Sequence, residues 1–500
     1  MGGGGWGTQR RGDEPSYFDD NTEQELEWYC CGSRNSTYIT IMATLDPLLT
    51  SSPYMESDMS VATAYPPDRP LIPRAQFWVS KLKGIGNHTK NRKYTVFGSN
   101  SDGLSVLVCR YLKPLQPPPG ISSRRACIHV VSLIPFIPDI QAFVGELDLW
   151  CTTKQTLEIM AGDEEEHATT LYNYLYYLSL RASGPPSDTK DSGSKSRSFE
   201  GYPSDTFVAH EELFLVSGYA IPEGHTTYVL IRKDGRASKN RLVHTADAFL
   251  IVNPCTGHVY SAADPNCPVK EIYSLATPYN VWGNIQKSSC PKDLSFDIMK
   301  PSLWQPLFNE KFRPGMTGIS SIQSDISYFP TSPGPCLEIE KILKNEIISQ
   351  FRKWRAKRAR PDTAFHPDAC EVMTDMLEWL EEWKMNGTMD GQAVVQGGRR
   401  ANSSESGFKS NDIPRNVLMA IEERAAHKLK NVSRTCTLTG YPVNMAYRDV
   451  DAVINTVRSF GVHETKHPKV DFILAVRVFP LFNGLLSLWI FIGTLERDRS

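Results

Sequence analysis

Three short segments hold the side chains of this chain that could do chemistry. The first is the acidic run Ala161–Ala168 (AGDEEEHA), which opens a predicted helix. Within it Asp163 and His167 are four residues apart, so they share one face of that helix. This spacing could serve a metal ion, but no second cluster with ligand spacing accompanies it in the sequence. A charged helix start explains the run equally well, because acidic side chains suit the positive end of the helix dipole. We therefore expect no metal and no cofactor.

The other two segments are predicted strands with polar ends. Gly224–Leu230 (GHTTYVL) begins one strand, and Asn253-Pro254-Cys255 follows the next. Cys255 and His258 flank a turn and could form a nucleophile pair. A working pair also needs a third residue that orients the imidazole, and none is evident. Roles in the turn and the core are the simpler interpretation.

Taken in order, the three segments resemble the core of the transglutaminase-like fold of papain-type cysteine enzymes. In that fold Gly-x-Cys starts a helix, His-x-Trp lies on one strand and Asp-Pro ends the next. The three chemical positions here hold Glu164, Thr226 and Asn253. A carboxylate seldom attacks an amide, and threonine cannot shuttle a proton near neutral pH. Alternation along the strand should turn the neighbouring His225 out of the site.

The resemblance therefore implies a pseudoenzyme with no catalytic residues. The alternative is an active cysteine-type amidohydrolase or transglutaminase that uses another nucleophile. A site without its nucleophile could still hold a peptide. Glu164 in a buried position would need a partner, which a basic or amide-bearing ligand could supply.

A wider set of motifs resembles the C-terminal half of the coiled-coil and C2 domain-containing proteins of the ciliary transition zone. The matching stretches are Arg110–Leu115, Val131–Asp139, Asp148–Trp150, Ala161–Ala168, Ala220–Gly224, Asn253–Cys255, Pro278–Trp282 and Phe460–His463. The resemblance implies a cytosolic, cytoskeleton-associated scaffold at the transition zone or basal body. Such a scaffold would support cilium assembly and the transition-zone gate, with other transition-zone proteins as partners.

The chain departs from that family at its start. Only Tyr38–Leu45 looks like a C2 strand, the last of that domain, and no coiled coil precedes it. We expect either a fragment of a longer protein or a short paralogue.

Composition excludes several function classes. The 500 residues include 54 basic and 56 acidic side chains, a net charge of −2, which gives no electrostatic case for nucleic-acid binding. The 11 cysteines lack a CxxC pair, as in cytosolic proteins with reduced thiols. The apolar stretch Val470–Gly493 contains Arg477, Pro480 and Asn483-Gly484, so it predicts a β-hairpin and no transmembrane segment.

The predicted fold class is α+β, a degenerate transglutaminase-like domain with a second, smaller α+β module. The predicted organisation is a disordered N-terminus with the last strand of a truncated C2 domain (1–50), a linker (51–74), the degenerate domain (75–313) with a mobile insert (183–204), a second linker (314–335) and the C-terminal module (336–500) with a polar insert (385–412). Helices are expected at 75–82, 126–133, 153–160, from 164, and at 337–360, 368–384, 417–429 and 447–460. Strands are expected at 104–109, 213–219, 227–232, 248–252 and 259–261, before the terminal hairpin.

Two predictions concern the C-terminal module. Its first two helices, 337–360 and 368–384, carry complementary charge and should pair as an antiparallel hairpin. The basic run Lys353–Arg360 could meet acidic lipids or glutamate-rich tubulin tails. The simpler interpretation is a solvated helix end, which suits the negative pole of its own dipole.

Overall fold

A computed structural model of the chain describes residues 29–33, 36–40, 64–139, 148–182, 213–232, 244–309, 319–358, 363–386, 436–467 and 470–497. It divides into two compact units, Met1–Asp58 and Met59–Ser500. The predicted insert at 183–204, most of the insert at 385–412 and the predicted helix at 417–429 lie outside the described residues.

The first unit contains an antiparallel hairpin of β1 (Tyr29–Ser33) and β2 (Ser36–Thr40). We expected one strand at Tyr38–Leu45 and disorder before it. The structure places β2 slightly earlier and adds β1 within the segment expected to be disordered. Tyr, Ile and Thr, which favour strands, make up most of β2 (STYIT), whereas β1 (YCCGS) contains only one of them and is not distinctive as a strand alone. Residues 41–45 lie outside the described part.

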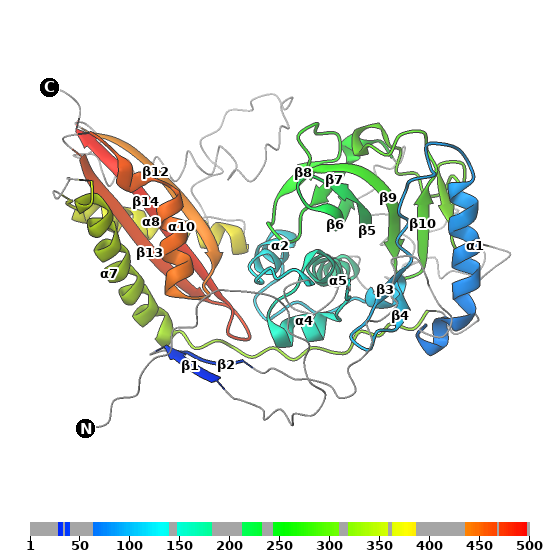
Figure 1. Cartoon of the computed structure of the whole chain (residues 1–500), viewed down its shortest axis with the longest axis horizontal. Coiled ribbons are helices and arrows are strands. Elements are labelled where there is room, and N and C mark those ends of the chain that lie inside the picture. The colour runs from blue at the N-terminus through cyan, green and yellow to red at the C-terminus, as the bar shows by residue number, and fades with distance from the viewer. Residues whose placement is uncertain are drawn as a thin grey trace, which may run out of the picture. The chain divides into compact units, whose positions relative to one another are not determined.

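The middle of the second unit is a seven-stranded antiparallel sheet in the order β11-β10-β9-β5-β6-β7-β8 (Figure 1). The predicted strands are confirmed as β5 (Leu213–Ala220), β6 (Gly224–Arg232), β7 (Phe249–Val252) and β8 (Val259–Ser261). Prediction missed β9 (Val269–Thr277), β10 (Asn280–Asn284) and β11 (Trp304–Pro306). Most of β9 is buried on both faces, so its sequence lacks the clean alternation of a half-exposed strand.

Helices cover one face of this sheet. They are α5 (Glu164–Ala182), α2 (Arg124–Ser132) and α4 (Thr153–Ile159), as Figure 1 shows. Along β6, Val229 and Ile231 join the core beneath α5, whereas Tyr228 and Leu230 join the core on the opposite face. Odd-numbered side chains of β6 therefore face α5 and even-numbered ones face away. This alternation decides which residues can meet the start of α5.

The helices α2 and α4 begin at hydroxyl caps. The Ser123 hydroxyl accepts from the Ala126 N–H at the start of α2, and Thr152 and Gln155 form a full capping box at the start of α4. The remaining elements are α1 (Ile72–Lys83), which contains the predicted helix 75–82, and the hairpin of β3 (Phe97–Ser99) and β4 (Ser105–Leu107). The predicted strand at 104–109 is shorter than expected, because a 3₁₀ turn begins at Val108.

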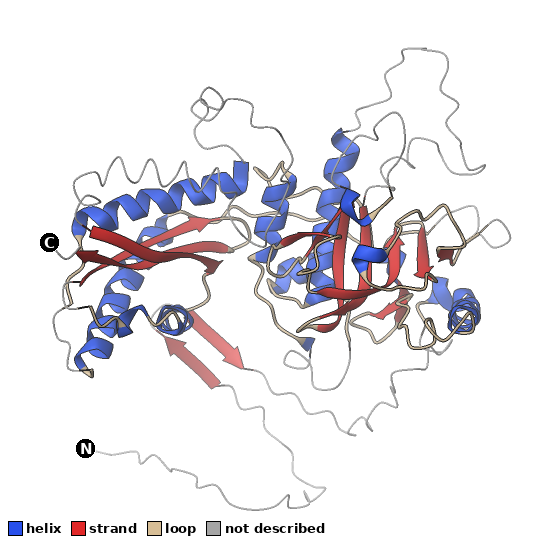
Figure 2. Cartoon of the chain, turned by 90° about the horizontal axis from the view of Figure 1, so that it is seen from above, coloured by secondary structure: helices blue, strands red, loops and turns tan. Residues whose placement is uncertain are grey.

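The C-terminal module is a three-stranded sheet in the order β12-β14-β13 with helices on both faces (Figure 2). The predicted hairpin is confirmed as β13 (Val470–Pro480) and β14 (Leu486–Arg497), and β12 (Cys436–Ala446) pairs along the outer side of β14. Among the described residues, no helix has the length and apolarity needed to cross a membrane.

The predicted pairing of the first two helices of this module is wrong. They are α7 (Gly334–Ala356) and α8 (Pro367–Asn386). α8 packs on the sheet face that presents Ile473 and Ala475, whereas α7 and α10 (Val450–Ser459) pack on the face that presents Leu474 and Val476. The hairpin β13–β14 is apolar on both faces, so each face needs its own helix.

The described part of the predicted second linker is held in place. Ile322 N–H donates to the Arg110 carbonyl (3.0 Å), and the Gln323 side chain bonds the main chain of Tyr111 and Thr153 (2.8 and 3.0 Å). Further on, Phe329 N–H donates to Asn483 Oδ1 in the turn of the terminal hairpin (2.8 Å). This segment is therefore a strap along the middle domain that reaches the C-terminal module.

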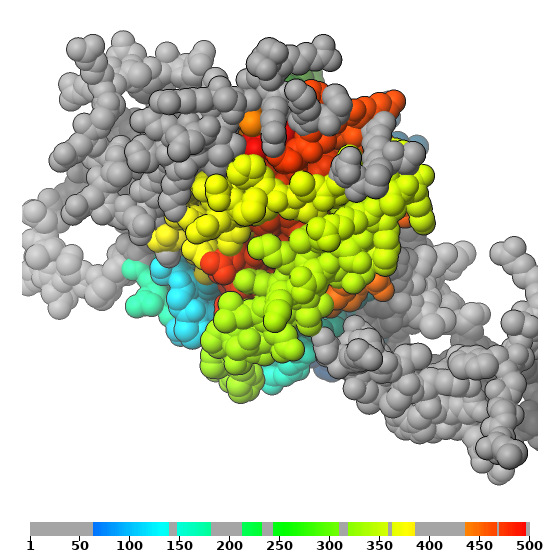
Figure 3. All heavy atoms as spheres, turned by 90° about the vertical axis from the view of Figure 1, so that its left-hand side faces the viewer, coloured from blue at the N-terminus to red at the C-terminus, as the bar shows by residue number. Residues whose placement is uncertain are grey.

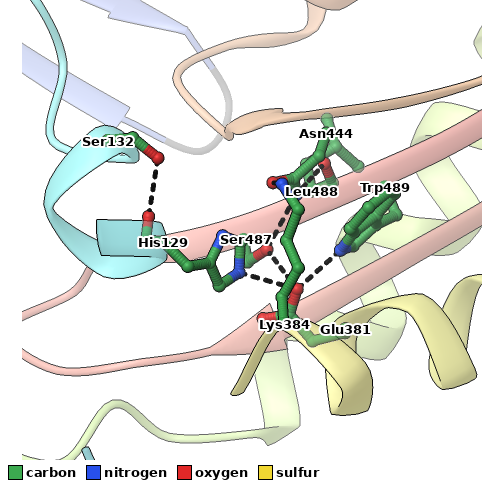
Figure 4. Close-up of polar contacts among 8 residues, drawn as sticks. All are labelled: His129, Ser132, Glu381, Lys384, Asn444, Ser487, Leu488 and Trp489. Carbon is green, nitrogen blue, oxygen red and sulfur yellow. Dashed lines mark hydrogen bonds and ion pairs between the residues drawn. The ribbon is translucent and has the colours of Figure 1, made fainter. Parts of the chain in front are cut away.

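A buried polar network joins the middle domain to the C-terminal module (Figure 4). One oxygen of Glu381 on α8 accepts from His129 of α2 (3.0 Å), Ser487 (3.1 Å) and Trp489 (2.6 Å). Burial alone would raise the pKa of Glu381, but these hydrogen bonds outweigh it and hold the pKa below its ordinary value. Burial also lowers the pKa of His129, so a neutral imidazole donates to a carboxylate. We call His129, Glu381, Ser487 and Trp489 the junction network.

Candidate functional site

The start of α5 is fixed by its own carboxylates. Glu166 accepts from the Asp163 N–H with one oxygen (3.0 Å) and from the Cys151 N–H with the other (2.7 Å). Asp163 accepts from the Glu165 N–H (3.2 Å). His167 is buried, with Nδ1 2.6 Å from the Asp163 carbonyl and Nε2 2.9 Å from the Ile134 carbonyl. Both ring nitrogens are thus occupied, which assigns His167 a structural part.

The carboxylates at this helix start crowd one another. Oxygens of Asp139, Asp163 and Glu166 lie within 4.8 Å of one another, as do those of Asp163, Glu164 and Glu165. Burial, joined by the neighbouring acids, raises the pKa of Asp139 to about 7 and that of Glu164 to about 7. Oxygen clusters of this type can hold a hard cation or share protons. Asp163 and Glu166 also accept main-chain N–H groups, so these two carboxylates hold the helix start as well as belonging to the cluster.

The strand opposite this helix start places Thr226 and Thr227 on different faces. The Thr227 hydroxyl donates to Glu165 Oε1 (3.0 Å). Thr226 shares the other face with Tyr228 and Leu230, and its buried hydroxyl has no hydrogen-bond partner among the described residues. The structure therefore brings together Glu165 and Thr227, each one residue beyond the predicted Glu164 and Thr226.

His225 lies near the start of the same strand. It is an odd-numbered residue of β6, so it shares the face of Thr227, and its ring lies between Tyr219 and Tyr273 at centroid distances of 5.7 and 6.1 Å. Tyr273 belongs to the core beneath α5. His225 therefore lies on the α5 side of β6, and the expectation that it turns out of the site stays a prediction.

Asn253 shapes a turn. Its Oδ1 accepts from the Cys255 and Thr256 N–H groups (3.0 and 3.1 Å), which is the hydrogen-bonding pattern of an Asx turn. Its amide donates to Tyr228 Oη (2.9 Å) and to Glu223 Oε1 (3.2 Å). The Asn253 side chain therefore stabilises the turn and bonds Tyr228 and Glu223. Its described contacts include no imidazole.

Cys255 lies in the turn that Asn253 shapes. Its electrostatic surroundings are unfavourable for a thiolate. Burial raises its pKa well above the ordinary value, and Glu164, Glu165, Asp163 and Glu223 raise it further. Activated cysteines have the opposite surroundings, a helix N-terminus without acids or a neighbouring cation. His258 is half-buried, and its Nδ1 bonds the Thr256 hydroxyl (2.7 Å) within the same turn.

We call Glu164, Glu165, Glu223, Asn253 and Cys255 the acidic site. The sequence analysis named Glu164 and Asn253 as site residues. It did not identify Glu165, Glu223 or Thr227 as residues that contact this site. Glu223 was within reach, because it lies in the Ala220–Gly224 stretch that carries the family resemblance. Predicting the Thr227 contact requires knowing which residues of β6 face α5. An error of one residue in the strand register exchanges the two faces.

The basic run of α7 is only partly solvated. Arg355 is buried, donates to the carbonyls of His463 and Thr465 (3.3 Å each) and lies over the Phe472 ring. Arg358 pairs with Glu464 (2.5 Å). Arg352, Lys353 and Lys357 are exposed. The interpretation as a solvated helix end therefore holds for these three side chains and is wrong for Arg355, which packs inside the module.

In the comparison with known protein families, the matching part of the chain is the middle domain. Residues 148–184 and 207–307 match the model of a family described as the CEP76 peptidase-like domain. The match contains α4, α5 and the strands from β5 to β11, which are the elements that position the acidic site.

Similarity to individual proteins extends over most of the chain. Human protein CC2D2B is 24% identical over 494 residues, which are 96% of this chain and 28% of that protein. Coiled-coil and C2 domain-containing protein 2A of Drosophila melanogaster is 22% identical over 398 residues, 78% of this chain and 24% of that protein. The human centrosomal protein of 76 kDa is 23% identical over 294 residues, 56% of this chain and 38% of that protein.

These matches confirm the resemblance to the coiled-coil and C2 domain-containing proteins. They also set its extent, because the chain spans about a quarter of the length of the two relatives that it matches over the longest stretches.

Proposed function

We propose that this chain, a relative of the coiled-coil and C2 domain-containing proteins, is a non-enzymatic scaffold at the base of the cilium. Its middle domain would be a degenerate transglutaminase-like domain of the papain type. The family resemblance supports this placement, and so does the similarity to a protein named for the centrosome. Its partners would be other proteins of the transition zone, and it would support cilium assembly and the transition-zone gate.

The observation that carries the non-enzymatic part is the charge around Cys255. Four carboxylates raise the pKa of this thiol beyond the effect of burial. A cysteine nucleophile must be a thiolate, and its rate falls as its pKa rises above ambient pH. The carboxylate Glu164, at the head of α5, is a poor nucleophile toward amides.

A screen with amide substrates and glutamine donors separates this proposal from the alternative of an active amidohydrolase or transglutaminase. We expect no turnover above a heat-denatured control. Turnover that disappears in Cys255→Ala and persists in Cys290→Ala would establish the alternative. Cys290 is a suitable control because it too is a partly exposed thiol in a loop.

The acidic site would bind a peptide through a lysine or arginine side chain. Glu164 and Glu165 have raised pKa values mainly because they are buried among other acids, and a bound cation would relieve that repulsion. The test compares a lysine peptide with a matched norleucine peptide, using fluorescence anisotropy. Glu164→Ala should weaken lysine-peptide binding about fivefold, as for a partly exposed ion pair.

Two controls make that test decisive. Glu158→Ala removes an exposed carboxylate from the neighbouring helix α4 and should leave affinity unchanged. Equal affinities for lysine and norleucine peptides, or equal affinities of the Glu164→Ala variant and the parent chain, would contradict cation binding at this site.

Placement at the cilium base is tested by imaging a tagged chain in ciliated cells. We expect the tag to coincide with a transition-zone or basal-body marker. Tubulin tails are a proposed secondary partner, supported by the exposed Arg352, Lys353 and Lys357. Co-sedimentation with microtubules before and after subtilisin removes the acidic tails tests that partner, and unchanged pelleting would contradict it.

A further inference from the structure

Two cavities of the second unit differ in the groups that line them. One lies between α7 and α8 on the face shown in Figure 3, and its volume is about 570 Å³. Arg477 lines it and pairs with Glu340 of α7 and Glu378 of α8, so ion pairs within the module already occupy this guanidinium. The other, of about 200 Å³, lies in the middle domain, and its lining includes two free thiols, Cys267 and Cys290.

Two segments of the middle domain bring these thiols to one small space. Cys267 lies in the turn before β9, and its carbonyl accepts from the Lys270 ammonium of that strand (2.8 Å). Cys290 follows Ser289, whose carbonyl accepts from the Ile272 N–H of β9 (2.8 Å). Hydrogen bonds to β9 therefore hold both segments, and each thiol lines the same cavity.

The two thiols differ in exposure. Cys267 is 2% exposed and belongs to the core on the sheet face opposite α5, whereas Cys290 is partly exposed just before a 3₁₀ turn. Burial raises the pKa of Cys267 to about 11, although the Val269 N–H and the Lys270 ammonium oppose this effect. A dissolved oxidant therefore reaches Cys290 before it reaches Cys267.

The donor set around the two thiols is unfavourable for a metal ion. Protein sites that bind metal through cysteine usually supply three or four ligands. Among the residues that the structure describes, neither thiol belongs to a group of three ligand atoms within 4.8 Å of one another. Lys270 and Lys292 also line the cavity, and their charge repels a cation. Thiol oxidation is the chemistry that this pair of side chains supports.

We propose that Cys290 and Cys267 form a site for reaction with hydroperoxides, in which oxidation joins the two by a disulfide across the cavity. The site shares no residue with the acidic site. The Cys290 thiolate attacks one oxygen of the hydroperoxide, the O–O bond breaks, and a proton from solvent converts the leaving oxygen to water or an alcohol.

The second step uses the buried thiol. The Cys267 sulfur attacks the sulfur of the Cys290 sulfenic acid, the S–S bond forms as the S–O bond breaks, and the hydroxyl leaves as water with the Cys267 proton. The hydroperoxide is thereby reduced by two electrons, and the pair of thiols is oxidised by two. Both thiols line one cavity, so this step is intramolecular and competes well with further oxidation.

The test treats the reduced full chain with hydrogen peroxide near neutral pH, blocks the remaining thiols with N-ethylmaleimide and digests with trypsin without reductant. Trypsin cleaves after Lys270 and Lys287, so the two cysteines fall on separate peptides unless a disulfide joins them. We expect mass spectrometry to find the Cys267–Cys290 pair as the main disulfide, and dithiothreitol to remove it. Absence of this pair at every peroxide dose, or an equal yield of other disulfides, would overturn the proposal.

Single variants separate the two roles. In Cys267→Ser the sulfenic acid at Cys290 has no resolving thiol, so its labelling by dimedone should rise about fivefold over the parent chain. In Cys290→Ser, oxidation of the buried Cys267 should fall to the level of the untreated chain. Cys370→Ser removes a half-buried thiol of α8 and should leave the yield of the disulfide unchanged. Equal dimedone labelling of Cys290 in the parent chain and in Cys267→Ser would contradict Cys267 as the resolving thiol.

Discussion

At the scale of single residues, the chemistry depends on where carboxylates sit. In a cysteine enzyme, a thiol at a helix start gains reactivity from the positive end of the dipole. Here the start of α5 carries Glu164, Glu165 and Glu166, and the negative charge of Glu164 and Glu165 raises the pKa of the Cys255 thiol beyond the effect of burial alone. Asn253 accepts from the Cys255 N–H within its own turn and donates to Glu223.

The raised pKa of Glu164 leads to a prediction about the free energy of unfolding. Because the folded-state pKa of Glu164 is raised to about 7, its stabilising protonated form is lost as pH rises through 7. Glu164→Gln should therefore raise the free energy of unfolding at pH 8 by about 1 kcal/mol, after allowance for its partial exposure, and by little at pH 4.5 or below. Urea denaturation at both pH values measures this. Glu158→Gln is the control, and an equal effect at both pH values would contradict the argument.

At the scale of elements, the sequence predicted strands and helices better than it predicted their neighbours. The apolar runs of β5 and β6 and the apolar faces of α7 and α8 were enough to find each element. The pairing of α7 with α8 was wrong because complementary charge is a weaker constraint than the two apolar faces of the terminal hairpin. Likewise, the one-residue shift at Thr226 arose because residue types do not fix the face of a strand when threonines are adjacent.

The buried end of α7 gives an element-scale prediction. Arg355→Ala removes a cation that packs on Phe472 and leaves the carbonyls of His463 and Thr465 without their donor. We expect a loss of about 2–4 kcal/mol in the free energy of unfolding. Arg352→Ala, an exposed arginine in the same helix, should change it by less than ~0.5 kcal/mol. Chemical denaturation compares the two, and similar small effects would show that Arg355 is not buried in solution.

At the scale of the whole second unit, the junction network and the strap join the middle domain to the C-terminal module. Neither could be predicted from the sequence, since His129 and Glu381 are 252 residues apart and neither is unusual in its own helix. The mixed α and β content was predictable from periodicity. The contact between modules was not, because it depends on the final positions of α2 and α8.

The junction network predicts acid sensitivity. The folded-state pKa values of both His129 and Glu381 are lowered, so the unfolded chain takes up more protons and stability falls as pH falls. The His129 contribution is lost below about pH 6.5 and the Glu381 contribution below about pH 4.5, which are the ordinary pKa values. Glu381→Ala should cost about 3 kcal/mol at pH 7, because three buried donors lose their acceptor. Stability profiles that are equally acid-sensitive in the parent and in a His129→Gln, Glu381→Gln double variant would contradict this.

The most direct test of the central claim is the pKa of the Cys255 thiol, measured from the pH dependence of its alkylation by iodoacetamide in the native chain and read by mass spectrometry. We predict a pKa above the ordinary value of 9.0, with little alkylation of Cys255 at pH 7, and a lower pKa when Glu164 and Glu165 are replaced by glutamine. A thiol that reacts rapidly at pH 7, with a pKa below about 7.5 as activated cysteines have, would contradict the assignment of this site as non-catalytic.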